Sequence, residues 1–343
     1  MKTATPALAR AINDRLALDL LLEHGPLTAP QLRTLTGLSR PTVADLIERL
    51  RANGLVQPCG EAGEDRRGPN ARLYTLVADR AHVAGVDIRR SGTHVTVADL
   101  TGATVGTAER PAVAEADLAA VIRDAVAAAA GGRTLEAVVL GAPGMVHPHT
   151  GRGLGPCDVG VAGWDPRLPD LVQEALGVPQ LVLENEVNLA AVAEHRVGAA
   201  SGREDFALLW LDEGVGGAVV LGGRVRQGAS GGAGEVGFLE LDGDNLCCAL
   251  EGPRLDAGDG ELFARQVARV VAVMVLVLDP GLVVLGGTTG RAGGADFAAA
   301  VSAQLDGRVP VPTEVRASAV EGNPVLQGAV LTALDLARDA VFG

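Results

Sequence analysis

The sequence predicts an α/β protein with an N-terminal winged helix-turn-helix followed by a two-lobed α/β domain. Three observations support this fold class. Residues 27–50 have the pattern of a helix, a turn and a helix, and residues 55–76 have the pattern of two strands around a charged tip. Beyond residue 81, two cycles of strands end in glycine turns. Two similar β-rich halves with glycines at their strand ends favour a clamp around a cleft.

The helix-turn-helix has recognisable boundaries. Gly37 predicts a tight turn, Ser39 can cap the second helix, and Pro41 then falls in the first turn, where a missing N–H costs nothing. Apolar residues recur at helical spacing in that helix, at Val43, Leu46, Ile47 and Leu50. The opposite face is expected to contact phosphates and base edges in a major groove. Its candidate DNA-binding residues are Ser39, Arg40, Pro41, Thr42, Asp45 and Arg49.

A wing is expected after the second helix. Leu55–Gln57 and Arg72–Leu76 have strand character, and they flank a run rich in glycine, proline and charge. Arg66, Arg67 and Arg72 would lie on or beside the tip, where cations can contact the DNA backbone. The alternative is a solvated hairpin on a plain three-helix domain, since charged runs often mean only that. The order of helix, turn, helix and basic wing favours DNA binding.

The charge is divided unevenly along the chain. The whole chain carries a formal charge of −13, but residues 1–80 contain 11 Lys and Arg against 9 Asp and Glu. The rest of the chain contains 18 Lys and Arg against 33 Asp and Glu. Only the N-terminal part can therefore approach DNA without strong repulsion.

Length and composition indicate a protein of two or three domains. The chain has 343 residues, 48% of them apolar, which is enough for sizeable cores. The N-terminus has no apolar signal region, and the apolar run Val270–Leu278 is too short to span a bilayer. The four cysteines lack the spacing of a disulfide scaffold, which is typical of a reducing compartment. We expect a cytoplasmic protein without a membrane partner.

Strands and helices alternate beyond residue 81. The expected strands are 83–88, 93–100, 104–109, 135–140, 181–183, two around the turn 214–217, and 282–285. The expected helices are 112–130, one that ends at Val197, and 267–278. No Ser/His/Asp or Cys/His set stands at a recognised spacing, so the sequence gives no support to a hydrolase.

Several segments of the chain carry a family resemblance. They are the winged-helix segment, Gly-Ala-Pro-Gly at 141–144, Glu-Asn-Glu-Val-Asn-Leu-Ala-Ala at 184–191, the glycine-rich run 228–237, and Asp-Pro-Gly-Leu-Val-Val-Leu-Gly-Gly at 279–287. In this order they resemble the ROK family, whose name joins repressors, open reading frames and sugar kinases. Its repressor branch carries a winged helix ahead of an actin-like, ribonuclease H-like kinase fold with two lobes.

The resemblance implies a division into domains. A winged-helix DNA-binding domain would span 1–80, and an effector and dimerisation domain would span 81–343. Lobe 1 would comprise about 81–198 plus the C-terminal helix, and lobe 2 about 199–322.

The phosphate-binding turns of the family's kinases are altered here. The first turn of those kinases has the pattern Asp-x-Gly-Gly-Thr. In this chain, Asp87-Ile88 is followed by Arg89-Arg90-Ser91. The second turn resembles Gly-Thr-Gly-Ile-Gly in the family and is Asp212-Glu213-Gly214 in this chain. Bulky side chains replace glycines whose backbone N–H groups approach a phosphate, and two carboxylates would repel a triphosphate. We expect that the ATP site is lost.

The catalytic and zinc positions are also altered. Glu186 stands where the family's kinases have the Asp of an Asn-Asp pair as general base, and its carboxylate sits one methylene further out. The alternative role of Asn185-Glu186 is to cap the following helix. Phe238 replaces a zinc-ligating histidine, and only the adjacent pair Cys247-Cys248 remains of the family's spaced cysteines. Adjacent cysteines cannot readily complete a tetrahedral site, so we expect no metal.

These observations lead to one functional expectation and two alternatives. The chain is expected to be a DNA-binding repressor of sugar-related genes with a non-catalytic kinase-like domain. The alternatives are a sugar kinase with an added DNA-binding module, and a regulator whose lobes only dimerise. The expected partners are double-stranded operator DNA, a sugar or sugar-phosphate effector, and further copies of the chain in a dimer or a dimer of dimers. The candidate ligand-binding residues are Gly144, Asn185, Glu186, Glu235 and Phe238.

Overall fold

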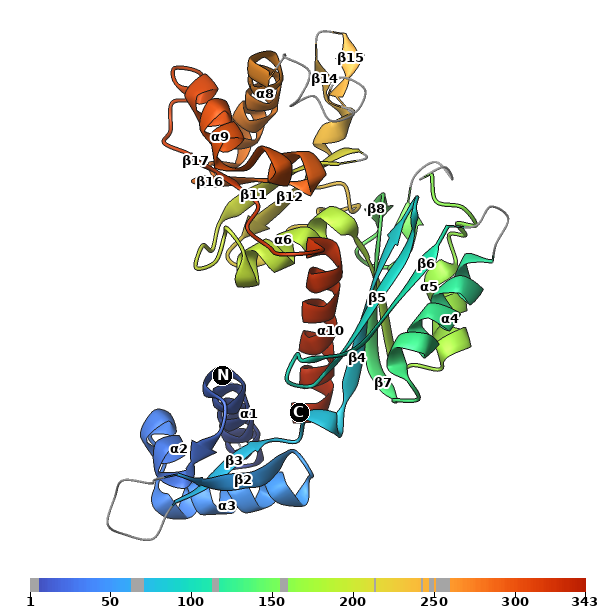
Figure 1. Cartoon of the computed structure of the whole chain (residues 1–343). Coiled ribbons are helices and arrows are strands. Elements are labelled where there is room, and N and C mark those ends of the chain that lie inside the picture. Colours follow the sequence, from blue (N-terminus) through green and yellow to red (C-terminus); the bar gives the residue numbers. More distant parts are fainter. Residues whose placement is uncertain are drawn as a thin grey trace.

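The computed structural model contains a winged helix and two α/β lobes (Figure 1). Two helices, at residues 186–197 and 324–342, pack between the lobes. The structure describes residues 6–62, 71–112, 117–154, 160–212, 214–241, 243–246, 250 and 260–343. The predicted α/β fold class is confirmed. Among the helices described, none combines the length and the apolar character that a bilayer crossing requires.

The winged helix contains three helices and a small antiparallel sheet. Its elements are α1 (Pro6–His24), β1 (Leu27–Thr28), α2 (Ala29–Thr36), α3 (Arg40–Ala52), β2 (Val56–Ala62) and β3 (Ala71–Leu76), with strand order β1-β3-β2. Local signals fix the helix boundaries. Thr28 and Gln31 form a reciprocal capping box at α2, and Gly37 adopts a left-handed conformation at its end, with φ +69°. Leu18, Leu32 and Leu46 fill the core.

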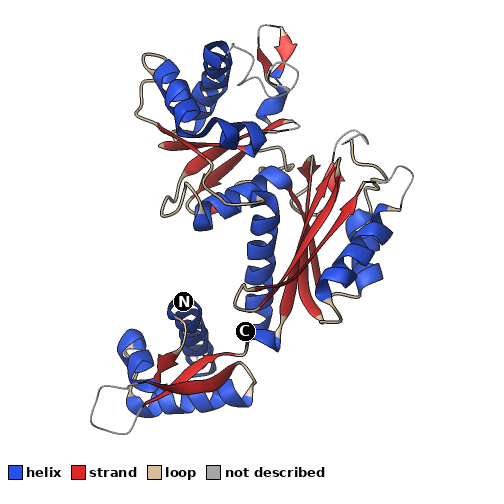
Figure 2. Cartoon of the chain, viewed as in Figure 1, coloured by secondary structure: helices blue, strands red, loops and turns tan. Residues whose placement is uncertain are grey.

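Lobe 1 is a five-stranded mixed sheet with strand order β10-β7-β4-β5-β6. Its strands are β4 (His82–Arg89), β5 (Gly92–Asp99), β6 (Thr104–Pro111), β7 (Leu135–Ala142) and β10 (Gln180–Asn185). The first three pair antiparallel, whereas β7 pairs parallel with β4 and β10. Two helices, α4 (Leu118–Ala130) and α5 (Leu168–Leu176), cover one face, and a short hairpin, β8 (Met145–Val146) and β9 (Gly153–Leu154), follows β7 (Figure 2).

Lobe 2 repeats the mixed-sheet plan with strand order β13-β12-β11-β16-β17. Its strands are β11 (Phe206–Leu211), β12 (Val215–Leu221), β13 (Arg224–Val225), β16 (Leu282–Gly286) and β17 (Glu314–Ala317). The helices α8 (Gly260–Leu278) and α9 (Gly287–Leu305) pack on one face. A 3₁₀ turn, η2 (Val236–Phe238), and a short pair, β14 (Glu240–Leu241) and β15 (Asp244–Asn245), lie between β13 and α8.

Two helices occupy the space between the lobes. α6 (Glu186–Val197) and α10 (Pro324–Phe342) pack against each other and against strands of both sheets, in one apolar cluster that includes Leu189, Leu208 and Val325. Their contact is very close, because a Cβ built on Gly328 would lie 1.9 Å from the Leu189 carbonyl oxygen. A glycine is therefore required at that crossing.

The observed boundaries differ from the expected ones, and three of the differences have a clear physical reason. The helix expected over 112–130 begins at Leu118, because β6 extends to Pro111. The helix expected over 267–278 begins seven residues earlier, at Gly260, with Phe263 and Ala264 buried in the core of lobe 2. The strand expected over 181–183 runs from Gln180 to Asn185, since its pairing with β7 extends beyond the apolar residues.

Candidate functional site

The first candidate site is the outer face of α3. Ser39 caps this helix by accepting a hydrogen bond from the Thr42 backbone N–H, and the two hydroxyl oxygens lie 2.8 Å apart. Arg40, Pro41 and Asp45 are exposed and Thr42 is half-buried, whereas Val43, Leu46, Ile47 and Leu50 are buried. The α3 helix therefore packs one face into the domain and presents the other to solvent, as a DNA-reading helix requires.

A groove between α2 and α3 extends this face. Arg33 of α2 and Arg40 of α3 line the groove together with Pro30 and Ala44. Two guanidinium groups beside one groove provide a positive surface of the kind that contacts phosphate oxygens. The contribution of Arg33 was not expected, because the sequence pattern by itself does not show which residues of the first helix lie beside the second.

Arg49 is not on this free face, so that part of the prediction is corrected. Its guanidinium forms an ion pair with both carboxylate oxygens of Asp14 in α1, and one of these N–O distances is 2.8 Å. The Arg49 side chain is 33% exposed and that of Asp14 is 14% exposed. Arg49 thus holds α1 against α3. The two residues are 35 positions apart and meet because α1 packs against α3. No local sequence pattern reveals such a contact.

The wing arginines are placed only in part. Arg72 is exposed on β3, opposite Glu61 of β2. Arg66 and Arg67 lie outside the described residues, so their role stays a prediction.

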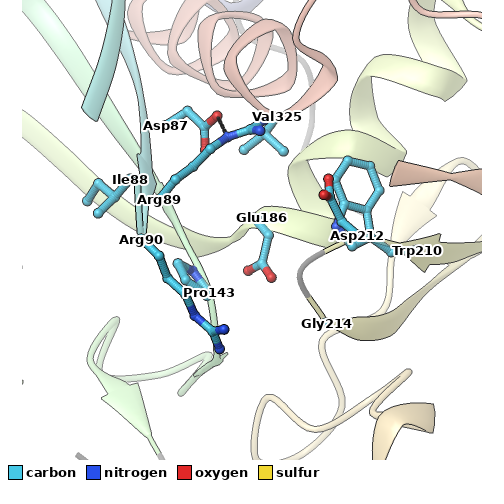
Figure 3. Close-up of a pocket in the computed structure, with 10 residues that line it drawn as sticks. All are labelled: Asp87, Ile88, Arg89, Arg90, Pro143, Glu186, Trp210, Asp212, Gly214 and Val325. Atoms are coloured by element: carbon cyan, nitrogen blue, oxygen red, sulfur yellow. Dashed lines mark hydrogen bonds and ion pairs between the residues drawn. The ribbon is translucent and has the colours of Figure 1, made fainter. Parts of the chain in front are cut away.

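The second candidate site is a pocket between the two lobes (Figure 3). It lies at the carboxyl ends of β4, β7 and β11 and at the first residues of α6 and α10, which is where open α/β sheets bind ligands. The lining residues are Asp87, Ile88, Arg89, Arg90, Pro143, Glu186, Trp210, Asp212, Gly214 and Val325. Its volume is about 110 Å³.

Asp87 is the anchor of one wall of this pocket. It is 1% exposed and accepts hydrogen bonds from Arg89 Nε and from Asn323 Nδ2, each at 2.6 Å. Both donors bind Oδ2, and an ion pair with a further hydrogen bond compensates the burial of a carboxylate. The Arg89 guanidinium is consequently held on Asp87, while Arg90 extends beside Pro143 (Figure 3).

Glu186 lines the pocket at the first position of α6, and Asn185 is the N-cap residue before it. The Asn185 side chain caps α6 by accepting from Val187 N and Asn188 N, and it donates to the Gly144 carbonyl oxygen and to Glu186, each at 3.0 Å. The capping role that was left open for this pair is therefore present. Burial raises the pKa of Glu186 to about 8, and the nearby carboxylates of Asp87, Glu235 and Asp212 act in the same direction.

Glu235 and Phe238 differ in their placement. Glu235 is half-buried just before η2, and burial raises the pKa of its carboxyl. Phe238 is 67% exposed, and neither Glu235 nor Phe238 is among the residues that line the pocket, so their role in ligand binding stays a prediction. The 3₁₀ turn Val236–Phe238 buries Gly237 and leaves the aromatic ring of Phe238 exposed.

Among the residues that line the pocket, the sequence predicted only Glu186 as ligand-binding. Asp87 and Trp210 lie near strand ends, Val325 lies in the first turn of α10, and Asn323 caps that helix without lining the pocket. The dipeptide Asn323-Pro324 is a helix-start signal and could have located the last pair. Glu213, Cys247 and Cys248 lie outside the described residues, among which no group of three His, Cys, Asp or Glu side chains is arranged to hold a metal.

Comparisons with known proteins match both parts of the chain. The model of the ROK family matches residues 83–252, and that of the MarR family matches residues 12–68. The xylose repressor of Bacillus subtilis (strain 168) is 23% identical over 293 residues, which cover 78% of this chain and 69% of the repressor.

Two solved structures share the fold. A ROK family transcriptional regulator, described as a homologue of the E. coli MLC protein, superposes with a TM-score of 0.73 at 17% identity, over 97% of this chain and 98% of that chain. The ROK hexokinase of Thermus thermophilus superposes with a TM-score of 0.62 at 29% identity, over 73% of this chain and 97% of the hexokinase. The likeness to the regulator includes the winged helix, whereas the hexokinase matches a smaller part of this chain.

Proposed function

The chain belongs to the ROK family and carries a MarR-type winged helix, and from this premise we propose that it represses sugar-related genes through an effector-sensing, non-catalytic kinase-like domain. The exposed and capped face of α3 is the observation that carries the proposal. The xylose repressor indicates the class of genes. The lobes supply the effector pocket and the surfaces for pairing two winged helices.

DNA binding is tested with a duplex selected by the protein from a random-sequence pool. Fluorescence anisotropy at several salt concentrations gives the affinity and its salt dependence. Specific binding is expected to exceed binding to a scrambled duplex by about 10³-fold or more. Equal affinity for the two duplexes would contradict a role in reading operator DNA.

A small carbohydrate fits the interlobe pocket better than a nucleotide does. Trp210, Val325 and Pro143 supply apolar surface, and Glu186 and Asp212 supply oxygens for hydroxyl groups. Binding sites of this kind combine apolar walls with a few polar groups that fix orientation. Calorimetry with D-xylose, D-glucose and N-acetylglucosamine tests this proposal, and the absence of heat for every sugar would leave the lobes as a dimerisation scaffold.

The same pocket argues against phosphoryl transfer. A kinase of this family approaches phosphate with glycine backbone at the first turn, where this chain places Arg89 on Asp87 and Arg90 beside Pro143. Asp212 lies at the second turn, lines the pocket and accepts a hydrogen bond from Thr288 at 2.8 Å, and its negative charge would repel a triphosphate bound there.

A sugar kinase with a DNA-binding module is the second candidate function, because the hexokinase shares the fold of the lobes. A coupled assay with MgATP and a hexose panel separates the two candidates. We expect no turnover above the background of a Glu186→Ala control, and turnover that this substitution abolishes would establish the kinase.

Pairing of two chains completes the proposal. One helix-turn-helix reads a few base pairs, so a specific operator site requires two winged helices that span a pseudo-palindrome. An isologous dimer through the lobes is expected. Light scattering that shows a monomer bound tightly to a full operator would exclude it.

A further inference from the structure

One helix extends from the interlobe pocket to the winged helix (Figure 1). α10 contains 19 residues, which corresponds to about 28 Å of helix. At its first turn Val325 lines the pocket, and its N-cap residue Asn323 donates to Asp87 at 2.6 Å. The start of α10 is thus bound to the same carboxylate that anchors one pocket wall.

The other end of α10 is docked in the winged helix. Phe342 is 6% exposed and lies in one apolar cluster with Leu18 and Leu21 of α1. The Arg15 guanidinium lies 5.3 Å from the centre of the Phe342 ring and donates to Asp339 at 2.8 Å. We call Arg15, Asp339 and Phe342 the clasp. A ring that is buried beneath a cation and among apolar side chains fixes the last turn of α10 to α1.

One face of the middle of α10 is packed tightly against β4 and α6, whereas its other face, at Gln327 and Leu331, lines a groove. A Cβ on Gly85 of β4 would lie 2.7 Å from Val330, and one on Gly328 would lie 1.9 Å from the Leu189 carbonyl oxygen. Tightly packed interiors shift between discrete arrangements and do not deform continuously. A displacement at the first turn is therefore carried along the helix.

We propose that α10 is the rod that couples occupancy of the interlobe pocket to the position of the winged helix, with Asn323 as the positioning residue at the pocket and the clasp as the attachment at the DNA-binding domain. The inference rests on the proposed function, because a pocket ligand is the signal. Coupling of this kind is reciprocal, so operator binding must change ligand affinity by the same factor.

The first experiment needs no effector. Hydrogen exchange is followed by mass spectrometry in the full chain and in Asn323→Ser, which keeps an N-cap oxygen but cannot reach Asp87. We expect exchange in α1 and in the last turn of α10 to rise by about threefold or more, although both lie far from the substitution. Glu321→Gln, an exposed neighbour, is the matched control and should leave both segments unchanged. A change confined to the first turn of α10 would overturn the proposal.

The second experiment uses the clasp. D-xylose, D-glucose and N-acetylglucosamine are tested first for binding to the wild type and for release of the selected duplex. In Phe342→Ala, sugar affinity should persist while release falls by about tenfold, and Ala340→Ser, at an exposed position in the same turn, should retain release. Arg15→Gln gives the same comparison if Phe342→Ala does not fold. Full release of the duplex by sugar in a folded clasp variant would contradict coupling through α10. If no sugar binds the wild type, the effector proposal fails. The hydrogen-exchange experiment would still test whether α10 couples the pocket to the winged helix.

Discussion

The Asn323 side-chain amide donates a hydrogen bond to Asp87 at 2.6 Å, across 236 positions of the chain. This contact joins the end of β4 to the N-cap of α10, while Arg89 occupies the same carboxylate oxygen. The buried charge of Asp87 thus has two donors, and one of them belongs to the helix that reaches the winged helix.

Removal of Arg40 should weaken operator binding. Arg40 is exposed at the first position of α3 and lines the groove beside Arg33. If Arg40 reads a base edge, Arg40→Ala costs about 1–3 kcal/mol of binding free energy and relaxes discrimination at one base position. Anisotropy with single-base variants of the selected duplex measures both effects. Arg123→Ala, which removes an exposed cation on α4 of lobe 1, is the control, and equal losses in the two variants would contradict base reading.

Loss of the α3 cap should destabilise the winged helix. Ser39→Ala leaves the Thr42 N–H without its side-chain acceptor, which costs about 1 kcal/mol of the free energy of unfolding. Ser39→Thr retains the acceptor and should cost much less. Urea unfolding followed by exchange of winged-helix amides measures the difference, and identical midpoints for both variants would show that the cap contributes nothing.

A methyl group at the crossing of α10 and α6 should be poorly tolerated. Gly328→Ala places a Cβ 1.9 Å from the Leu189 carbonyl oxygen, so one helix must move, at a cost of about 1–3 kcal/mol or more. Gly260→Ala, where no atom lies within 4 Å of the new Cβ, is the matched control. Thermal unfolding should separate the two variants by several degrees. Equal midpoints would show that the crossing relaxes freely.

The stability of the lobes should depend on the ionisation of Glu186. Its pKa is raised to about 8 from an ordinary value of 4.5, so the folded state binds a proton more tightly than the unfolded chain does. Its contribution to the free energy of unfolding is therefore complete below pH 4.5 and is lost as the pH rises to about 8.

Glu186→Gln removes this ionisation and tests the sign. Relative to the wild type, the variant should gain up to a few kcal/mol of stability between about pH 5 and pH 8.5, and nothing further above that range. Urea unfolding at a series of pH values provides the measurement. Parallel pH profiles for the two proteins would show that Glu186 titrates normally.

Local patterns in the sequence determined much of the winged helix. Gly37 ends α2 and Ser39 caps α3, and the apolar spacing from Val43 to Leu50 selects the buried face. These features depend on residues a few positions apart, so they can be recognised in the sequence. The same is true of the glycine turns at strand ends, and the family resemblance that they carried is confirmed.

Only the tertiary structure decided which polar groups meet. Arg49 had the spacing of an outward residue, but Asp14 of α1 binds it. Phe238 follows a glycine-rich run, but its side chain is exposed at the end of a 3₁₀ turn. The bond between Asp87 and Asn323 and the burial of Phe342 beside α1 likewise depend on elements far apart in the chain. Sequence periodicity indicates which face of an element is buried, but the partner of that face depends on how whole elements pack. For this reason the pocket wall and the clasp could be identified only in the folded chain.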